Sequence, residues 1–185
     1  MNTSNFYFGF NQRDFRPLLL GMLAFLLTFF VTTRSHAQSN NNHIMVGVGM
    51  SYERGLDASI AYEHGIKYHN AWEYFGAYHI KYEDDPVAGH ITKDSFWNSY
   101  NSWHLGVCYK PCVTRGRNHH GNVRLGVSGG SDSKDFICGI HVGYEHSFAL
   151  KGGWELFFQI KEDVIIPRSS DLFRTGAMFG VKVPL

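Results

Sequence analysis

The sequence predicts an all-β protein whose strands close into an eight-stranded antiparallel up-and-down β-barrel of an outer membrane. Three observations predict this fold class. An apolar segment near the N-terminus is typical of an export signal, apolar residues then recur at every second position, and the intervening positions carry a nearly balanced set of charges. Together they indicate an exported chain whose strands have one apolar and one polar face.

The first 37 residues are typical of a secretory signal peptide. Arg13 and Arg16 precede an apolar run over 18–31, and the small residues Ser35 and Ala37 suit a cleavage site. This run is short for a membrane-spanning helix, which needs about 20 apolar residues. We therefore expect a signal peptide over residues 1–37 and an outer-membrane β-barrel domain over residues 38–185.

The charge balance argues against one large class of function. Without the three arginines and one aspartate of the leader, the chain keeps 14 of its 17 basic and 15 of its 16 acidic residues. A general nucleic-acid binder carries a basic surplus. We therefore expect no direct nucleic-acid binding.

Eight runs with the strand period of two follow the leader, separated by clusters of Gly, Pro, Asn, Asp and Ser. They cover residues 43–52, 56–64, 71–83, 100–110, 121–130, 135–147, 153–165 and 172–185. Most are close to the ~9–11 residues that cross a bilayer at a tilt, whereas strands of soluble proteins usually hold ~5–6. Because a bilayer offers no water to unpaired edge groups, such strands must close, which gives a barrel of OmpA or OmpX size.

Aromatic residues gather near the ends of these runs, as in the two interfacial girdles of an outer-membrane barrel. With the amino terminus in the periplasm, the inner girdle would hold Trp72, Tyr109, Phe148 and Trp154, and the outer girdle Tyr82, Trp103, Phe136 and Phe173. Glu162 shares the lipid-facing phase of its run. We expect it near the outer rim, since a carboxylate at mid-membrane depth is costly.

The opposite phase of each run predicts the barrel interior. Seven acidic and six basic residues fall on it, which suits paired charges that fill a narrow barrel better than a selective pore with a surplus of one sign. The expected interior network includes Glu73, Lys81, Arg124, Glu145, Glu155, Lys161, Asp163, Arg174 and Lys182. No cofactor is expected there.

The segment from Lys110 to Gly121 is unusually long for an inner turn of such a barrel. Its bases and histidines could contact an acidic partner, phosphate or peptidoglycan carboxylates. The predicted periplasmic partner contact consists of Lys110, Arg115, Arg117, His119 and His120. A plain solvated turn is one alternative, and metal binding by the two histidines with Cys112 is another, although no recognised ligand spacing supports it.

The cysteines are Cys108, Cys112 and Cys138, and an odd number in an exported chain leaves at least one thiol outside any intramolecular bridge. A bridge between Cys108 and Cys112 is possible in an oxidising compartment. Pro111 lies inside that short loop, so the sequence leaves the pairing open.

Enzymatic alternatives rest on two features. The longest expected outer loop contains Asp84, Asp85 and His90, which acid–base hydrolysis could use, although Asp-Asp-Pro is also an ordinary loop opening. A lipid hydrolase needs an activated serine, and the His-x-Ser of the lipid A deacylase type does not occur in the chain. His146 and Ser147 are adjacent, so their side chains lie on opposite faces of a strand. We assign no catalytic residue.

Several segments together resemble the conjugal transfer protein TraO family of Bacteroides-type conjugative transposons. They are K-P-C from Lys110, R-G-R-N-H-H-G from Arg115, G-Y-E-H from Gly143, F-F-Q-I-K-E-D from Phe157 and F-R-T-G-A from Phe173. The resemblance covers most of the chain after the leader and is firmer in its second half. It implies a component of a conjugative DNA-transfer apparatus at the cell envelope, and it brings no catalytic residues.

The leading hypothesis is a non-enzymatic outer-membrane component that anchors or helps assemble that apparatus through its loops. Its partners would be outer-membrane lipid and other proteins of the transfer machinery. Three alternatives stay open: a general OmpX-like or OmpA-like surface barrel for adhesion or envelope stability, an outer-membrane lipid hydrolase or protease, and a soluble lipocalin-like binder.

Overall fold

The computed structural model describes residues 42–52, 54–98, 100–132, 134–166 and 172–185. The expected signal peptide over residues 1–37 lies outside the described residues. The strands are β1 (Asn42–Ser51), β2 (Gly55–Gly65), β3 (Ala71–Lys81), β4 (Tyr100–Lys110), β5 (Cys112–Arg115), β6 (His119–Ser131), β7 (Phe136–Ala149), β8 (Glu155–Ile166) and β9 (Phe173–Pro184). The eight long strands correspond to the eight expected runs, with shifts of a few residues at their ends.

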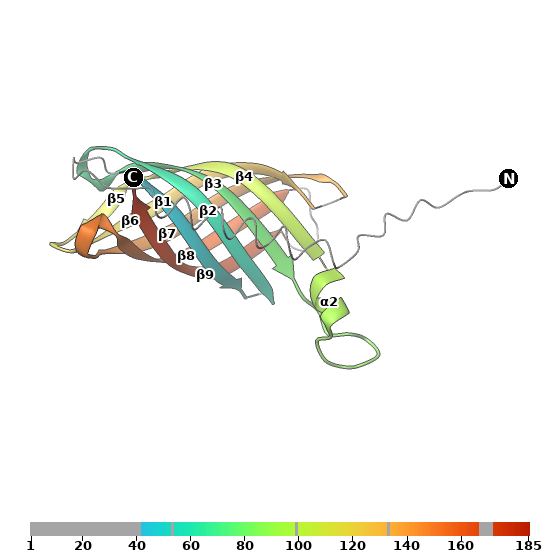
Figure 1. Ribbon diagram of the computed structural model, residues 1–185. Coiled ribbons are helices and arrows are strands. Elements are labelled where there is room, and N and C mark those ends of the chain that lie inside the picture. Colours follow the sequence, from blue (N-terminus) through green and yellow to red (C-terminus); the bar gives the residue numbers. More distant parts are fainter. Residues whose placement is uncertain (1–41, 53, 99, 133, 167–171) are drawn as a thin grey trace. The chain divides into compact units, whose positions relative to one another are not determined.

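The strands form one closed antiparallel barrel (Figure 1). Each long strand pairs with its neighbours in the chain, and β1 closes the barrel against β9 with a register that runs from His43 opposite Pro184 to Ser51 opposite Gly176. On the far side β4 pairs with both β3 and β6. The predicted fold class, an eight-stranded up-and-down outer-membrane type of barrel, is therefore confirmed.

The short strand β5 corrects the expected long turn after Lys110. Pro111 has no N–H to donate and ends β4, and the chain then resumes pairing with β6, where Arg115 lies opposite His120. The turn itself is tight, because the Gly116 N–H donates to the His119 carbonyl at 2.8 Å. The segment is thus a β-hairpin, which we call the basic hairpin (residues 111–119).

The two ends of the barrel differ in their connections. At the terminus end, where the Leu185 N–H donates to the Asn42 carbonyl, the connections include two short 3-10 turns, η1 (Lys67–His69) and η2 (Lys151–Gly153). The loop end carries the longest connection, residues 82–99, which contains the short helix α2 (Lys93–Asn98) (Figure 1). Among the described residues, no helix has the length and apolar character that crossing a membrane requires.

Outward-facing side chains are apolar over the middle of the strands. Exposed examples come from every long strand: Val46, Ile60, Tyr74, Leu105, Val127, Ile140, Phe158 and Phe179. Two residues of the expected inner girdle contact each other, since the rings of Trp72 and Tyr109 lie 5.1 Å apart at the terminus end. Such a belt of apolar side chains on a closed sheet fits contact with lipid.

Glu162 lies on the outward face of β8, in its loop-end half. The Thr175 hydroxyl of β9 donates to its carboxylate at 2.5 Å. This bond gives the carboxylate one partner on the outer surface, which lowers the cost of placing it there.

Inward-facing side chains are mostly polar, with a small apolar layer between two polar clusters. Met45, Ala61, Phe75, Cys108, Phe157 and Met178 form this layer. On β2, for example, Ala61 lies between Asp57 on the loop side and Glu63 on the terminus side. Because inward positions alternate along every strand, the sequence period sets the order of the layers.

Candidate functional site

The terminus-side cluster is centred on two buried lysines. Lys110 Nζ lies 2.6 Å from Glu145 Oε1 and 3.2 Å from Glu73 Oε2, and it also contacts Glu63. The Lys110 side chain has no exposed surface. Carboxylates from β2, β3 and β7 thus meet at the ammonium group of a lysine from β4.

Lys182 of β9 joins the same carboxylates from the opposite wall. Its Nζ lies 2.8 Å from Glu145 Oε1 and 2.9 Å from both carboxylate oxygens of Glu63. Glu155 lies farther away, at 3.7 Å from Lys182. The shared glutamates satisfy charges that would otherwise be expensive to bury.

Arg124 completes this cluster from β6. Its Nε and Nη2 donate to Glu73 Oε1 at 2.9 and 2.6 Å, and its guanidinium lies 4.6 Å from the centre of the Phe75 ring. A planar guanidinium can make both contacts at once. The cluster is thereby tied to the apolar layer.

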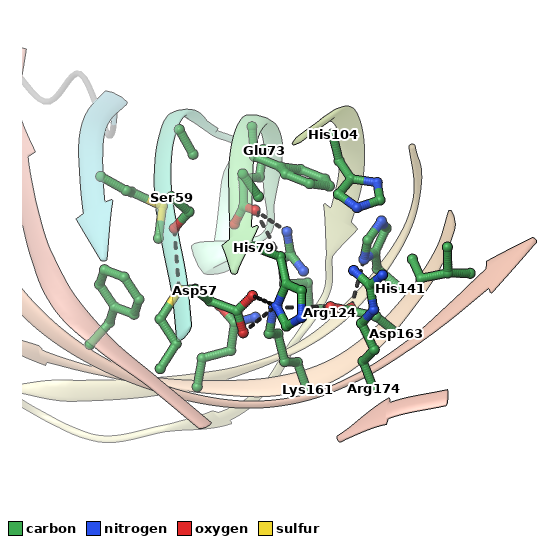
Figure 2. A pocket seen from close by; sticks show the side chains of 18 residues that line it. Asp57, Ser59, Glu73, His79, His104, Arg124, His141, Lys161, Asp163 and Arg174 are labelled. Carbon is green, nitrogen blue, oxygen red and sulfur yellow. Dashed lines mark hydrogen bonds and ion pairs between the residues drawn. The ribbon is translucent and has the colours of Figure 1, made fainter. Parts of the chain in front are cut away.

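The loop-side cluster is centred on Lys161, which bridges two aspartates (Figure 2). Its Nζ lies 3.1 Å from Asp57 Oδ2 and 3.0 Å from Asp163 Oδ2. His79 Nδ1 lies 2.8 Å from the other oxygen of Asp57. Asp57 therefore uses both oxygens, one for the lysine and one for a histidine ring.

Arg174 lies near the loop end of this cluster. Its two terminal nitrogens donate to the Ser102 hydroxyl at 3.2 Å and to the Tyr100 hydroxyl at 3.1 Å. The guanidinium also stacks against the Tyr100 ring, 5.5 Å from its centre. These contacts hold the second cation of the loop-side cluster in the interior through neutral groups.

An interior cavity of about 30 Å³ is lined by residues of both clusters and of the apolar layer (Figure 2). A water molecule needs about 10–15 Å³ by this kind of measure, so the cavity has room for about two waters. His104 Nδ1 is buried near it without a hydrogen-bond partner, which water could supply. The volume is too small for a lipid chain, a sugar or a hydrated ion pathway.

A Ser–His–Asp chain that the sequence patterns missed lies in the loop-side cluster. His141 Nδ1 lies 2.7 Å from Asp163 Oδ1, and His141 Nε2 lies 2.7 Å from Ser128 Oγ. These are the contacts of a hydrolase triad. Here, however, His141 and Asp163 are buried inside the barrel, and Asp163 is also paired with Lys161.

The structure places the expected interior residues on the inner wall but not in equal roles. Glu73, Arg124, Glu145 and Lys182 belong to the terminus-side cluster, and Lys161, Asp163 and Arg174 to the loop-side cluster. Glu155 is half-buried at the edge of the first cluster, and Lys81 is half-buried at the loop end of β3. Asp57 and Glu63 also occupy inward-facing positions, and their central place in the two clusters becomes clear only from the contacts across the barrel.

The predicted partner contact is corrected at two residues. Lys110 is the last residue of β4 and its inward phase buries it, so it cannot serve as a surface contact. His120 also faces inward and is 8% exposed, with its ring 4.8 Å from that of His69. Because successive residues of a strand face opposite sides, His119 points outward instead.

The exposed part of the contact is Arg115, Arg117 and His119 of the basic hairpin. Arg115 donates to the Tyr68 carbonyl in η1, and its guanidinium lies 5.8 Å from the Tyr68 ring centre. The His119 ring stacks on His146 of β7, with centroids 5.1 Å apart. The hairpin is therefore held against both neighbouring hairpins while its turn stays exposed.

The hypothetical metal site does not form. His119 and His120 point to opposite faces of β6, and Cys112 Sγ contacts the Thr114 carbonyl at 3.2 Å. Among the described residues, no group of three or more His, Cys, Asp and Glu side chains is arranged to hold a metal ion. The three cysteines are unbridged, with Cys108 fully buried in the apolar layer.

The acidic residues of the long loop take part in loop structure. Asp84 forms an ion pair with Arg54 at 2.6 Å. Asp85 accepts hydrogen bonds from the Val87 and Ala88 N–H groups at 2.8 and 3.2 Å, and these bonds lower the pKa of its carboxyl group. His90 donates to the Ala88 carbonyl at 2.9 Å. The residues proposed for acid–base chemistry are thus engaged in a turn.

Comparisons with known proteins place the chain by its fold. No protein-family model matches it, and no curated protein matches it in sequence. It is similar to Neisserial surface protein A, NspA, at a TM-score of 0.54 and 14% identity over 78% of this chain and 94% of that one. It is also similar to the outer membrane protein Ail of Yersinia pestis, determined in a phospholipid bilayer nanodisc, at a TM-score of 0.52 and 11% identity over 78% of this chain and 98% of that one. The chain therefore has the fold of an outer-membrane β-barrel.

Proposed function

We propose that this protein is a non-enzymatic outer-membrane barrel that serves as a structural or assembly component of a conjugative DNA-transfer apparatus through its turns. The observation that carries this proposal is the filled interior. Buried ion pairs occupy both polar clusters, and the cavity between them, about 30 Å³, has no room for a substrate. We therefore place the function on the surfaces outside the membrane.

The apolar outer face and the fold similarity support a position in the outer membrane. The fold of both structural neighbours and the exposed apolar side chains on every long strand agree with this position. Short turns at one end and a long loop at the other are typical of periplasmic and extracellular ends, respectively. We accordingly assign the terminus end to the periplasm.

The basic hairpin is the surface best suited to hold a periplasmic partner. Arg115 and Arg117 are exposed on a hairpin that is fixed by contacts to Tyr68 and His146. Arginines on a rigid support lose less conformational entropy when they bind carboxylates or phosphates. The hairpin is also one of the segments that resemble TraO, which connects this surface to DNA transfer.

The test is complementation of donor cells that lack the gene. The variant Arg115→Ala/Arg117→Ala/His119→Ala should lower the transfer frequency as far as deletion does, while its heat-modifiable migration in gels still reports a folded barrel. The matched control Lys93→Ala/Lys134→Ala removes two exposed cations at the loop end and should restore transfer.

Two outcomes would contradict the proposal. Normal transfer in the deletion strain would favour a general surface barrel for adhesion or envelope stability. Normal transfer with the hairpin variant, in cells where deletion abolishes it, would remove the basic hairpin as the contact.

A further inference from the structure

The turns at the terminus end carry basic side chains and no acidic ones. Among residues 66–70, 111–118 and 150–154 the charged residues are Lys67, Arg115, Arg117 and Lys151. All four side chains are exposed. The structure gives none of the four an ion pair with another described residue, so their charges are available to an external anion.

Two of these turns share one geometry and place a lysine at the same position. In η1 the Ile66 N–H donates to the Asn70 carbonyl at 2.6 Å, and in η2 the Leu150 N–H donates to the Trp154 carbonyl at 2.7 Å. In both turns the two residues after the lysine have positive φ, at 66° and 60° in η1 and at 79° and 83° in η2. Lys67 and Lys151 therefore occupy equivalent positions in two turns of the same geometry, one between β2 and β3 and the other between β7 and β8.

The charges lie directly beyond the aromatic girdle of this end. Trp72 follows Lys67 by five residues and Trp154 follows Lys151 by three, and each indole is 40% exposed on the outward face. Tryptophan at this place marks the interface between acyl chains and headgroups. Because Lys67 and Lys151 lie in the turns that lead into these tryptophans, we place both lysines near the depth of lipid phosphates.

We propose that Lys67, Arg115, Arg117 and Lys151 form a basic ring that binds anionic phospholipid headgroups in the leaflet at the terminus end. Lys supplies a compact charge and Arg a planar fork for phosphate oxygens. The attraction acts within a Debye length of the headgroup plane. The loop end has the opposite composition, with six acidic and three basic residues among the described residues 52, 54, 82–98, 132, 134, 135 and 172, so the preference should be confined to one leaflet.

The distribution of the four charges around the rim favours lipid as the occupant of the whole ring, and the periplasmic partner proposed above would contact only its hairpin sector. Every described turn at this end carries at least one of the four cations, so the charges are spread around the rim. Lipid surrounds a barrel on all sides, whereas a protein segment would contact one sector of the rim. This lipid binding is independent of the proposed role in DNA transfer, because it requires only the bilayer.

The test compares the quenching of rim tryptophans by two brominated lipids. The variant Trp97→Phe/Trp103→Phe keeps Trp72 and Trp154 as the only indoles of the chain, which has four. It is refolded into phosphatidylcholine vesicles that contain a small, equal fraction of either dibrominated phosphatidylglycerol or dibrominated phosphatidylcholine. We expect quenching by the phosphatidylglycerol to be stronger by roughly twofold, and the difference to fall as salt is added.

Two matched variants show whether the basic ring causes the difference. Adding Lys67→Gln, Arg115→Gln, Arg117→Gln and Lys151→Gln should bring the two quenching values together. The variant Trp72→Phe/Trp97→Phe/Trp154→Phe keeps only Trp103, which lies at the loop end of β4, and should show no preference for phosphatidylglycerol.

Equal quenching in the first variant would overturn the proposal. Binding of an oligoglutamate peptide to the detergent-solubilised protein, lost in the four-glutamine variant, would then assign the ring to an acidic protein segment instead. The proposal is separable from the role in DNA transfer, since Lys67→Gln/Lys151→Gln should weaken the lipid preference and leave transfer unchanged.

Discussion

Lys110 Nζ lies 2.6 Å from Glu145 Oε1 inside the barrel, and neither side chain has any exposed surface. This pair joins β4 to β7 across the interior rather than along the sheet. The two strands are not hydrogen-bonded neighbours. The interior charges therefore stabilise the closed form of the barrel as well as its individual hairpins.

Replacing Lys110 by Met should destabilise the barrel strongly. The substitution leaves Glu145, Glu63 and Glu73 with fewer cations in a buried place, and breaking a buried ion pair costs about 3–5 kcal/mol. Urea unfolding in detergent micelles, followed by tryptophan fluorescence, measures the change. The control Lys67→Met removes an exposed cation and should stay within about 0.5 kcal/mol of the parent. Equal effects of the two substitutions would show that the interior network contributes little.

Ser128 should behave as a structural residue. In the neutral tautomer that donates to Asp163, His141 Nε2 accepts the Ser128 hydroxyl, and Ser128→Ala leaves that nitrogen unpaired at a cost of about 1–3 kcal/mol. A fluorophosphonate probe should not label the folded protein. Labelling that disappears in Ser128→Ala would instead identify a serine hydrolase and contradict the non-enzymatic assignment.

The long loop should lose order in acid through Asp85. The N–H groups of Val87 and Ala88 lower the pKa of its carboxyl group in the folded state. The turn is therefore stabilised at pH values above the unfolded pKa, roughly 3.9, and loses this stabilisation as the pH falls through the lower folded value. The chemical shift of the Val87 amide proton, measured in a pH titration, should report this transition with a midpoint below the pKa of an unperturbed aspartate. A midpoint above that pKa would show that these hydrogen bonds do not form.

The proposed orientation, with the terminus end in the periplasm, predicts which cysteines can be labelled from outside the cell. In a Cys112→Ala/Cys138→Ala background, Lys134→Cys at the loop end should react with a membrane-impermeant maleimide on intact cells. Arg117→Cys in the basic hairpin should react only after the outer membrane is permeabilised. The reverse pattern would mean that the hairpin faces outward and would remove the periplasmic assignment.

The fold and the inner wall follow from sequence because both depend on the strand period of two. Once the phase of a run is known, residues such as Arg124 and Lys161 must face inward. The period also shows why the prediction of Lys110 as a surface contact is wrong, since its phase is inward although it borders a basic segment.

Contacts between distant strands could not be predicted in the same way. The pairing of Lys182 with Glu63 joins residues far apart in the chain and depends on barrel closure and register. The Ser128–His141–Asp163 chain comes from three strands and has no sequence motif. The continuation of β4 into β5 past Pro111 was hidden for another reason, because a proline followed by Gly and Asn resembles a simple turn.

A filled interior leaves the barrel without a continuous path for ions, and single-channel recording in planar bilayers measures this property. The wild-type protein should show no stable ion conductance. A variant in which Lys110, Lys182, Glu63 and Glu145 are all replaced by Gly should conduct, provided that it still folds in micelles. A reproducible conductance of the wild-type barrel would show that its interior is open and that function need not lie at its ends.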